Sequence, residues 1–189
     1  MALRRGFKTE ANDIAREVRA DLGLRREAPL DPWELADQLD IPVNGMSELS
    51  ADARSAVRYF RDVDPSSFSA VTVFRGFRRL IVHNDTHSQG RQASDVCHET
   101  SHALLLHPPT PAIDDKGRRD WDAEMEAEAE CLSGTLLVPE EAALYIVRRG
   151  LPIPIAAEEY GVTPKMMDFR IAVTAARRRV QRMSGARSR

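Results

Sequence analysis

The chain is organised around one stretch, Val96-Cys97-His98-Glu99-Thr100-Ser101-His102-Ala103-Leu104-Leu105-Leu106-His107, which contains the pattern His-Glu-x-x-His. If this stretch is helical, His98 and His102 share one face, so both imidazoles can reach one cation. Glu99 then lies beside them and can act as general base toward a metal-bound water. A chance match has a probability on the order of one in a hundred, and the simpler alternative is a solvated helix with two unrelated histidines.

The composition indicates a folded protein without membrane or disulfide features. The 189 residues suffice for one domain, or one domain with a small appendage, and 42% of them are hydrophobic. No apolar run approaches the length of a membrane span, and the basic N-terminus lacks the apolar segment of a signal peptide. Cys97 and Cys131 are too few for a disulfide framework. We therefore expect a cytoplasmic protein with no membrane partner.

Hydrophobic periodicity predicts helices with one small sheet. We expect helices over 9–22, over 31–39 with Asp31 as N-cap and Pro32 as first helical residue, and over 51–60. Strands are expected over 68–74 and 79–84 as a hairpin, with the segment around Val43 as a third strand, because a lone hairpin is marginal in water. This antiparallel sheet should pack against the central helix, expected over 89–106 with Ser88 as cap. Its edge strand can pair with an extended substrate.

Catalytic zinc normally has three protein ligands, so a third donor is needed. The segment 121–138 is predicted to be a helix, and it carries five carboxylates: Asp122, Glu124, Glu126, Glu128 and Glu130. On a helical wheel its apolar residues, among them Trp121, cluster within about 60°, and Glu128 lies beside them while Glu126 and Glu130 point away. A solvated acidic face explains the other carboxylates, so Glu128 is the predicted ligand. Cys131 is the rival donor, although we expect a small buried thiol there.

The two motifs together resemble those of the ImmA/IrrE family of metallopeptidases. That family pairs a His-Glu-x-x-His helix with a second helix of the form Glu-Ala-x-x-aromatic-Ala-x-x-Leu-Leu-Met-Pro. The chain matches it with Glu128-Ala129-Glu130-Cys131-Leu132-Ser133-Gly134-Thr135-Leu136-Leu137-Val138-Pro139. Leu132 replaces the aromatic residue, Gly134 an alanine and Val138 the methionine. The resemblance covers roughly residues 30–176.

This resemblance implies the fold, the cofactor and the reaction. It implies an α+β, predominantly helical protein: a zincin-like core whose short three-stranded antiparallel sheet packs against the His-Glu-x-x-His helix, plus a C-terminal helical region. By position it places the Zn²⁺ ligands at His98, His102 and Glu128, and the catalytic base at Glu99. Members of the family often cleave helix-turn-helix repressors in transcription regulation or stress responses. A repressor substrate would here be a separate chain.

The C-terminal region raises a competing role. We divide the chain into a peptidase core, residues 1–139, and a C-terminal helical region, residues 140–189. Within the latter, the segment 156–163 resembles the start of a helix-turn-helix, with Thr163 as cap of a long final helix, and residues 171–189 hold six arginines and no acid. The start of that helix offers only Lys165 and Arg170 as cations. We therefore expect a structural or partner-docking role rather than nucleic-acid binding.

The predicted function is zinc-dependent hydrolysis of a peptide bond in a protein substrate, with Glu99 moving the proton. An additional donor should stabilise the oxyanion, and Tyr145, Tyr160, His83 and His107 are all candidates. The alternative is a non-catalytic regulatory or binding protein that keeps the zincin fold. A free carboxylate at Glu99 beside an open coordination position argues against a purely structural site. The substrate, the activating signal and the oligomeric state stay open.

Overall fold

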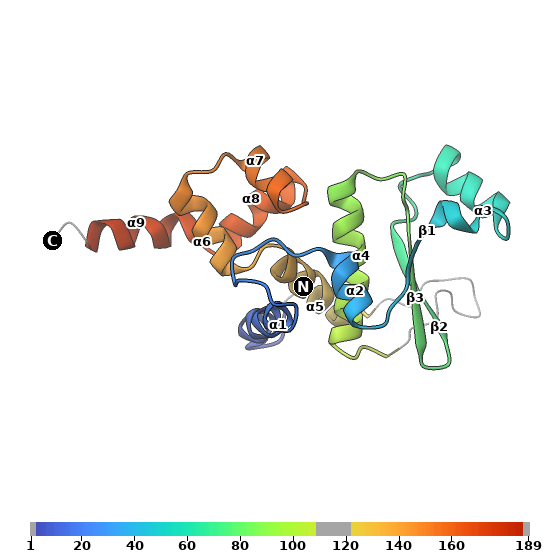
Figure 1. Ribbon diagram of the computed structural model, residues 1–189, viewed down its shortest axis with the longest axis horizontal. Helices are drawn as coiled ribbons and strands as arrows, with labels where there is room; N and C mark the ends of the chain where they lie inside the picture. The colour runs from blue at the N-terminus through green and yellow to red at the C-terminus, as the bar shows by residue number, and fades with distance from the viewer. Residues whose placement is uncertain (1–2, 109–121, 187–189) are drawn as a thin grey trace.

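The computed structural model describes residues 3–108 and 122–186, so Trp121 lies outside the described residues. The sheet and the C-terminal helices lie at opposite ends of the molecule, with α4 and α5 between them (Figure 1). The elements in chain order are α1 (Phe7–Asp21), α2 (Pro32–Gln38), β1 (Val43–Gly45), η1 (Met46–Ser50), α3 (Arg54–Arg58), η2 (Tyr59–Val63), β2 (Ala70–Arg75), β3 (Arg78–His83), α4 (Gln89–Leu104), α5 (Ala123–Leu137), α6 (Glu140–Arg149), α7 (Ile153–Glu159), α8 (Pro164–Val173) and α9 (Ala176–Ala186). The α+β, mostly helical class predicted from the sequence is confirmed.

The sheet has the order β1-β3-β2 and is mixed. The predicted hairpin is confirmed: β2 and β3 pair antiparallel, with Thr72 opposite Ile81, and Gly76 has a φ of 62° in the turn. The prediction of a purely antiparallel sheet was wrong, because β1 pairs parallel to β3, with Val43 opposite Ile81. The direction of so short a strand depends on where the chain returns through η1, α3 and β2, which the strand's own residues do not encode. Within the described residues β2 pairs only with β3, so its outer edge is free.

Helix α4 is held between the sheet and the helical core. It contacts β2 and β3 on one side and α2 and α5 on others. The α2 helix begins as predicted, since the Asp31 side chain accepts a hydrogen bond from the Trp33 amide at 2.8 Å and Pro32 opens the helix. At α4, Ser88 is the N-cap by position but makes no side-chain capping bond. The sequence therefore predicts the start of both helices correctly, but the capping hydrogen bond expected from Ser88 is not formed.

The core lies around the C-terminal half of α5, where every residue from Leu132 to Val138 is buried. Such a buried helix end needs partners for its last carbonyl groups. Two buried arginines supply them: Arg19 of α1 donates to the Leu136 carbonyl at 2.7 Å, and Arg170 of α8 donates to the Val138 carbonyl at 2.9 Å. These bonds tie α5 to α1 and α8 and so fix the direction in which its N-terminal half leaves the core.

The C-terminal region is helical, as predicted, but the expected long final helix is divided. Thr163 caps α8 by accepting a hydrogen bond from the Met166 amide at 3.2 Å. The helix then breaks at Ala175, which has a φ of 52°, and α9 follows in a new direction (Figure 1). The boundary placed at residue 139 stays a prediction. Within residues 3–108 and 122–186, no helix has both the length and the apolar character that crossing a membrane requires.

Candidate metal centre

The His-Glu-x-x-His pattern lies within α4, as expected. Val96, Cys97, Thr100 and Ser101 face the interior, and the two buried hydroxyls are satisfied because they donate to carbonyls one turn back, at 2.8 Å in both cases. His98 and His102 lie on the neighbouring side and are partly exposed. The helix therefore buries one face firmly and presents both imidazoles beside it.

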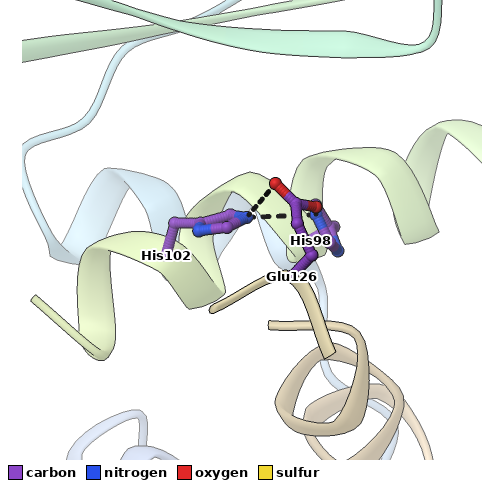
Figure 2. A group of neighbouring side chains, drawn as sticks. All are labelled: His98, His102 and Glu126. Carbon is purple, nitrogen blue, oxygen red and sulfur yellow. Dashed lines mark hydrogen bonds and ion pairs between the residues drawn. The ribbon is translucent and has the colours of Figure 1, made fainter. Parts of the chain in front are cut away.

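Three side chains meet where α4 passes the start of α5 (Figure 2). The Nε2 atom of His98 is 3.1 Å from Nε2 of His102 and 3.2 Å from Oε2 of Glu126. The His102 Nε2 atom is 3.8 Å from Oε1 of Glu126. A search of the described residues for three or more His, Cys, Asp or Glu side chains whose donor atoms could hold one ion finds this group.

The spacing of these donor atoms fits zinc. Zinc binds imidazole nitrogen and carboxylate oxygen at about 2.0–2.2 Å in a tetrahedral arrangement, which separates two ligand atoms by roughly 3.3 Å. The observed separations of 3.1, 3.2 and 3.8 Å lie around this value. Two nitrogens and one carboxylate are also the donor set of many catalytic zinc sites, which leave a fourth position for water.

The two histidines of the cluster have pKa values that shift in opposite directions. Burial lowers the pKa of His98, but the hydrogen bond with Glu126 and the charges of nearby glutamates outweigh burial and leave this pKa raised. Burial, together with the positive charge of His98, lowers the pKa of His102 to about 4. His102 is therefore neutral, and the contact with Glu126 favours a proton on His98. A divalent cation would take the place of that proton.

Glu128, the third ligand predicted both from the helical wheel and from the family resemblance, does not join this cluster. It is buried, as the wheel indicated, with 8% of the residue exposed, but its carboxylate contacts Arg4 at 2.5 Å and lies 3.7 Å from Nε2 of His107. The wheel ranked the carboxylates by burial. Because the cluster opens onto a cleft, its carboxylate comes from the border between the buried and the exposed face, where Glu126 lies. That border was the signal that could have pointed to Glu126.

Glu99 lies next to the cluster, and its carboxylate is turned toward the sheet. Its Oε2 atom accepts a hydrogen bond of 2.5 Å from the Thr72 hydroxyl on β2. Sequence reasoning missed Thr72, since nothing in a strand pattern tells which hydroxyl meets a carboxylate on another element. The hydrogen bond holds the predicted base in one position beside the two histidines.

A cleft of about 620 Å³ gives access to these groups. The lining residues that carry acidic or basic chemistry are His98, Glu99, Glu126, Asp95 and Glu130. Its rim, residues 66–70, is held by Asn84, whose side-chain amide donates to the Phe68 carbonyl at 3.0 Å and the Pro65 carbonyl at 3.3 Å. The rim leads directly into β2. A second hollow, near Arg58, is lined by no histidine, and its one carboxylate, Asp62, pairs with Arg61.

The predicted oxyanion donors do not line this cleft. The Tyr160 hydroxyl donates to the Glu27 carbonyl at 2.6 Å, and His83 is buried against the Trp33 ring. Tyr145 lies on α6 under the Arg149 guanidinium. His107 is buried behind His102. The rival donor Cys131 lies outside the three-residue cluster, as does Cys97.

Comparison with known proteins agrees with the motifs. A model of the peptidase M78 family, described as the IrrE N-terminal-like domain, matches residues 46–172. The matched range spans the hairpin, α4 and α5, and therefore every residue of the cluster. A search of curated proteins finds no match to the chain.

Proposed function

The chain belongs to the IrrE N-terminal-like, or ImmA/IrrE, family of metallopeptidases, and from this premise we propose that it is a zinc-dependent endopeptidase. One observation carries the proposal: two imidazole nitrogens and a carboxylate oxygen lie 3.1–3.8 Å apart at a cleft, next to the Glu99 carboxylate. A structural zinc site uses all four positions for protein ligands, whereas this site offers three ligands and a neighbouring base.

His98, His102 and Glu126 would hold the ion. A bound zinc ion supplies a water of lowered pKa, near about 7, and polarises the scissile carbonyl. Glu99, held by Thr72, accepts the water proton and later donates it to the leaving amine. The sequence pattern supports this role, because the glutamate that follows the first histidine of His-Glu-x-x-His acts as the general base in metalloproteases, and Glu99 occupies that position.

The edge of β2 that pairs with no other strand among the described residues is the proposed binding surface for the substrate backbone. A peptide in extended form can add to that edge through main-chain hydrogen bonds, which places it along the rim that leads into the cleft. The rim is fixed by Asn84, so the edge is preorganised. This arrangement favours an unfolded or flexible segment of a protein as substrate.

The proposed substrate class is a separate helix-turn-helix repressor. Support comes from the resemblance of the chain to a family in which such repressors are frequent targets. Cleavage would then relieve repression, in transcription regulation or a stress response. Comparing the proteomes of cells that carry the wild type and the Glu99→Gln variant would reveal the substrate as the protein that accumulates in the variant.

Zinc content and cleavage together test the proposal. Purified protein should carry about one zinc ion per chain, and Glu99→Gln should retain the ion while abolishing cleavage. Glu126→Gln should release the ion. Protein that takes up no zinc after supplementation would overturn the enzyme proposal, and a zinc-loaded protein whose biological effect survives Glu99→Gln would favour a non-catalytic regulator.

A further inference from the structure

We propose that His107 and Glu128 are positioning residues that set the tautomer and the orientation of His102. The proposal rests on the proposed metal site and extends it. It concerns three side chains in a row, from the Glu128 carboxylate through the His107 ring to the His102 ring. No step of the reaction involves His107 or Glu128 directly.

The end of α4 brings His107 back to His102. The amide of His107 donates to the His102 carbonyl at 3.0 Å, and the amide of Leu106 donates to the Ala103 carbonyl at 3.1 Å. These two bonds, with Leu106 in the left-handed region at a φ of 54°, form the Schellman end of the helix. The chain therefore folds back, and His107 is only 8% exposed although it follows the helix.

The contact between the two rings defines where the protons lie. Nδ1 of His102 is 2.8 Å from Nδ1 of His107. His102 offers its other nitrogen, Nε2, to the cluster with His98 and Glu126 (Figure 2). A ligand nitrogen carries no proton, so the His102 proton is on Nδ1 and is donated to His107. His107 accepts at Nδ1 and must then carry its own proton on Nε2.

The Nε2 atom of His107 faces a negative charge. It lies 3.7 Å from Oε2 of Glu128, which is longer than a direct hydrogen bond, so the interaction is electrostatic in this geometry. The other carboxylate oxygen, Oε1, accepts a hydrogen bond of 2.5 Å from Nε of Arg4. Arg4 thus holds the Glu128 carboxylate behind His107, where the carboxylate favours the tautomer that the His102 contact requires.

The arrangement also explains a buried carboxylate and a buried histidine that the metal cluster does not use. Both are more than nine-tenths buried, and such groups are stable only with partners. Partners that orient a histidine ligand typically change metal affinity by 10–100-fold when they are removed. We expect losses of that size, smaller than the loss caused by removing a ligand.

Zinc affinity of the full chain, measured by competition with a chromogenic chelator, tests the proposal. His107→Ala and Glu128→Gln should each weaken zinc binding by roughly 10–100-fold, whereas His102→Ala should abolish measurable binding. Glu124→Gln is the matched control, because Glu124 is an exposed carboxylate near the start of α5, the helix that carries Glu128, and this variant should bind zinc as the wild type does. His107→Gln should recover part of the affinity, because its amide oxygen can accept the His102 proton.

A second measurement separates positioning from a purely structural role. Nitrogen NMR of the zinc-loaded wild type should show His102 protonated at Nδ1. In His107→Ala the His102 nitrogen signals should change, while the backbone amide spectrum remains that of a folded protein. Wild-type affinity in both His107→Ala and Glu128→Gln would overturn the proposal. Complete loss of zinc in Glu128→Gln would also overturn it, because Glu128 would then be a ligand. A wild type that binds no zinc would instead overturn the proposed function.

Discussion

Gly90 is the residue whose replacement by alanine tests the packing of the metal-site helix. It is the second residue of α4 and lies against the turn before α8. A Cβ atom at this position would be 2.7 Å from the Val162 carbonyl carbon and 2.9 Å from the Thr163 amide nitrogen. Both neighbours are backbone atoms, so no side chain can rotate away. The α4 helix and the turn would have to move apart by several tenths of an ångström.

Two effects of opposite sign decide the outcome. Alanine is favoured over glycine inside a helix by about 1 kcal/mol. Forcing an extra methyl group into a close contact costs about 1–3 kcal/mol, and the upper end applies where backbone must shift. We therefore expect Gly90→Ala to lower the free energy of unfolding by about 1–2 kcal/mol. For a chain of this size the midpoint of thermal unfolding should fall by roughly 2–8 °C.

Gly134→Ala provides the matched control. Gly134 lies in α5, and a Cβ atom there would meet the Arg170 side chain at 3.3 Å and the Met166 sulfur at 3.8 Å. Both are side-chain atoms. Arg170 is held by its hydrogen bond to the Val138 carbonyl, so its displacement offsets part of the gain in helix propensity, which should still dominate. We expect the free energy of unfolding to rise by about 0.5 kcal/mol.

Urea unfolding followed by circular dichroism at two wavelengths gives both free energies, with coincident transitions as the check of two-state behaviour. Opposite shifts of the urea midpoint are expected for the two variants. If Gly90→Ala were as stable as the wild type or more stable, the close approach of α4 to the turn before α8 would not exist in solution. If both variants lost the same stability, the effect of an added methyl group would not depend on whether its neighbours are backbone or side-chain atoms, contrary to our reasoning.

Three further outcomes are expected. Thr72→Val removes a hydrogen bond to a carboxylate, worth about 1.5–3 kcal/mol, and should lower the turnover of a quenched-fluorescent peptide roughly 10–100-fold while the zinc content stays unchanged. The control, Thr72→Ser, should retain activity. A fall in zinc content in Thr72→Val would contradict the positioning of Glu99 by Thr72. Removing zinc with a chelator should lower the midpoint of thermal unfolding, measured by calorimetry, by roughly 5–10 °C. Adding zinc to about 100 times its dissociation constant should restore the midpoint. A midpoint that does not respond to zinc would contradict the proposed metal site. Ala175→Gly relieves left-handed backbone strain and should stabilise the chain by about 0.5–1 kcal/mol in urea unfolding, and a loss of stability would refute that strain.

Local signals were sufficient for much of the fold. The Asp31-Pro32 start of α2, the hairpin turn at Gly76 and the Thr163 cap of α8 all involve residues within a few positions of one another, and the structure has each of them. The parallel pairing of β1 and the break at Ala175 were missed. The direction of β1 depends on where a distant chain segment returns, and the residues of the strand itself do not encode that.

The sequence by itself determined the chemistry of the site. His98 and His102 are four positions apart, so any helical fold of this stretch presents two imidazoles on one side with Glu99 next to them. The sequence also shows that the next predicted helix, residues 121–138, carries several carboxylates. These features depend only on helical periodicity, which is a property of the backbone.

Tertiary structure alone decided which carboxylate meets the histidines. Glu126 and Glu128 are two residues apart on α5 and point to different sides, so the choice depends on how α5 is rotated against α4. That rotation is set by contacts far away in the chain, including Arg19 and Arg170 at the buried end of α5. Hydrophobic periodicity tells which side of a single helix is buried. The candidate metal site depends in addition on how two helices are oriented toward each other.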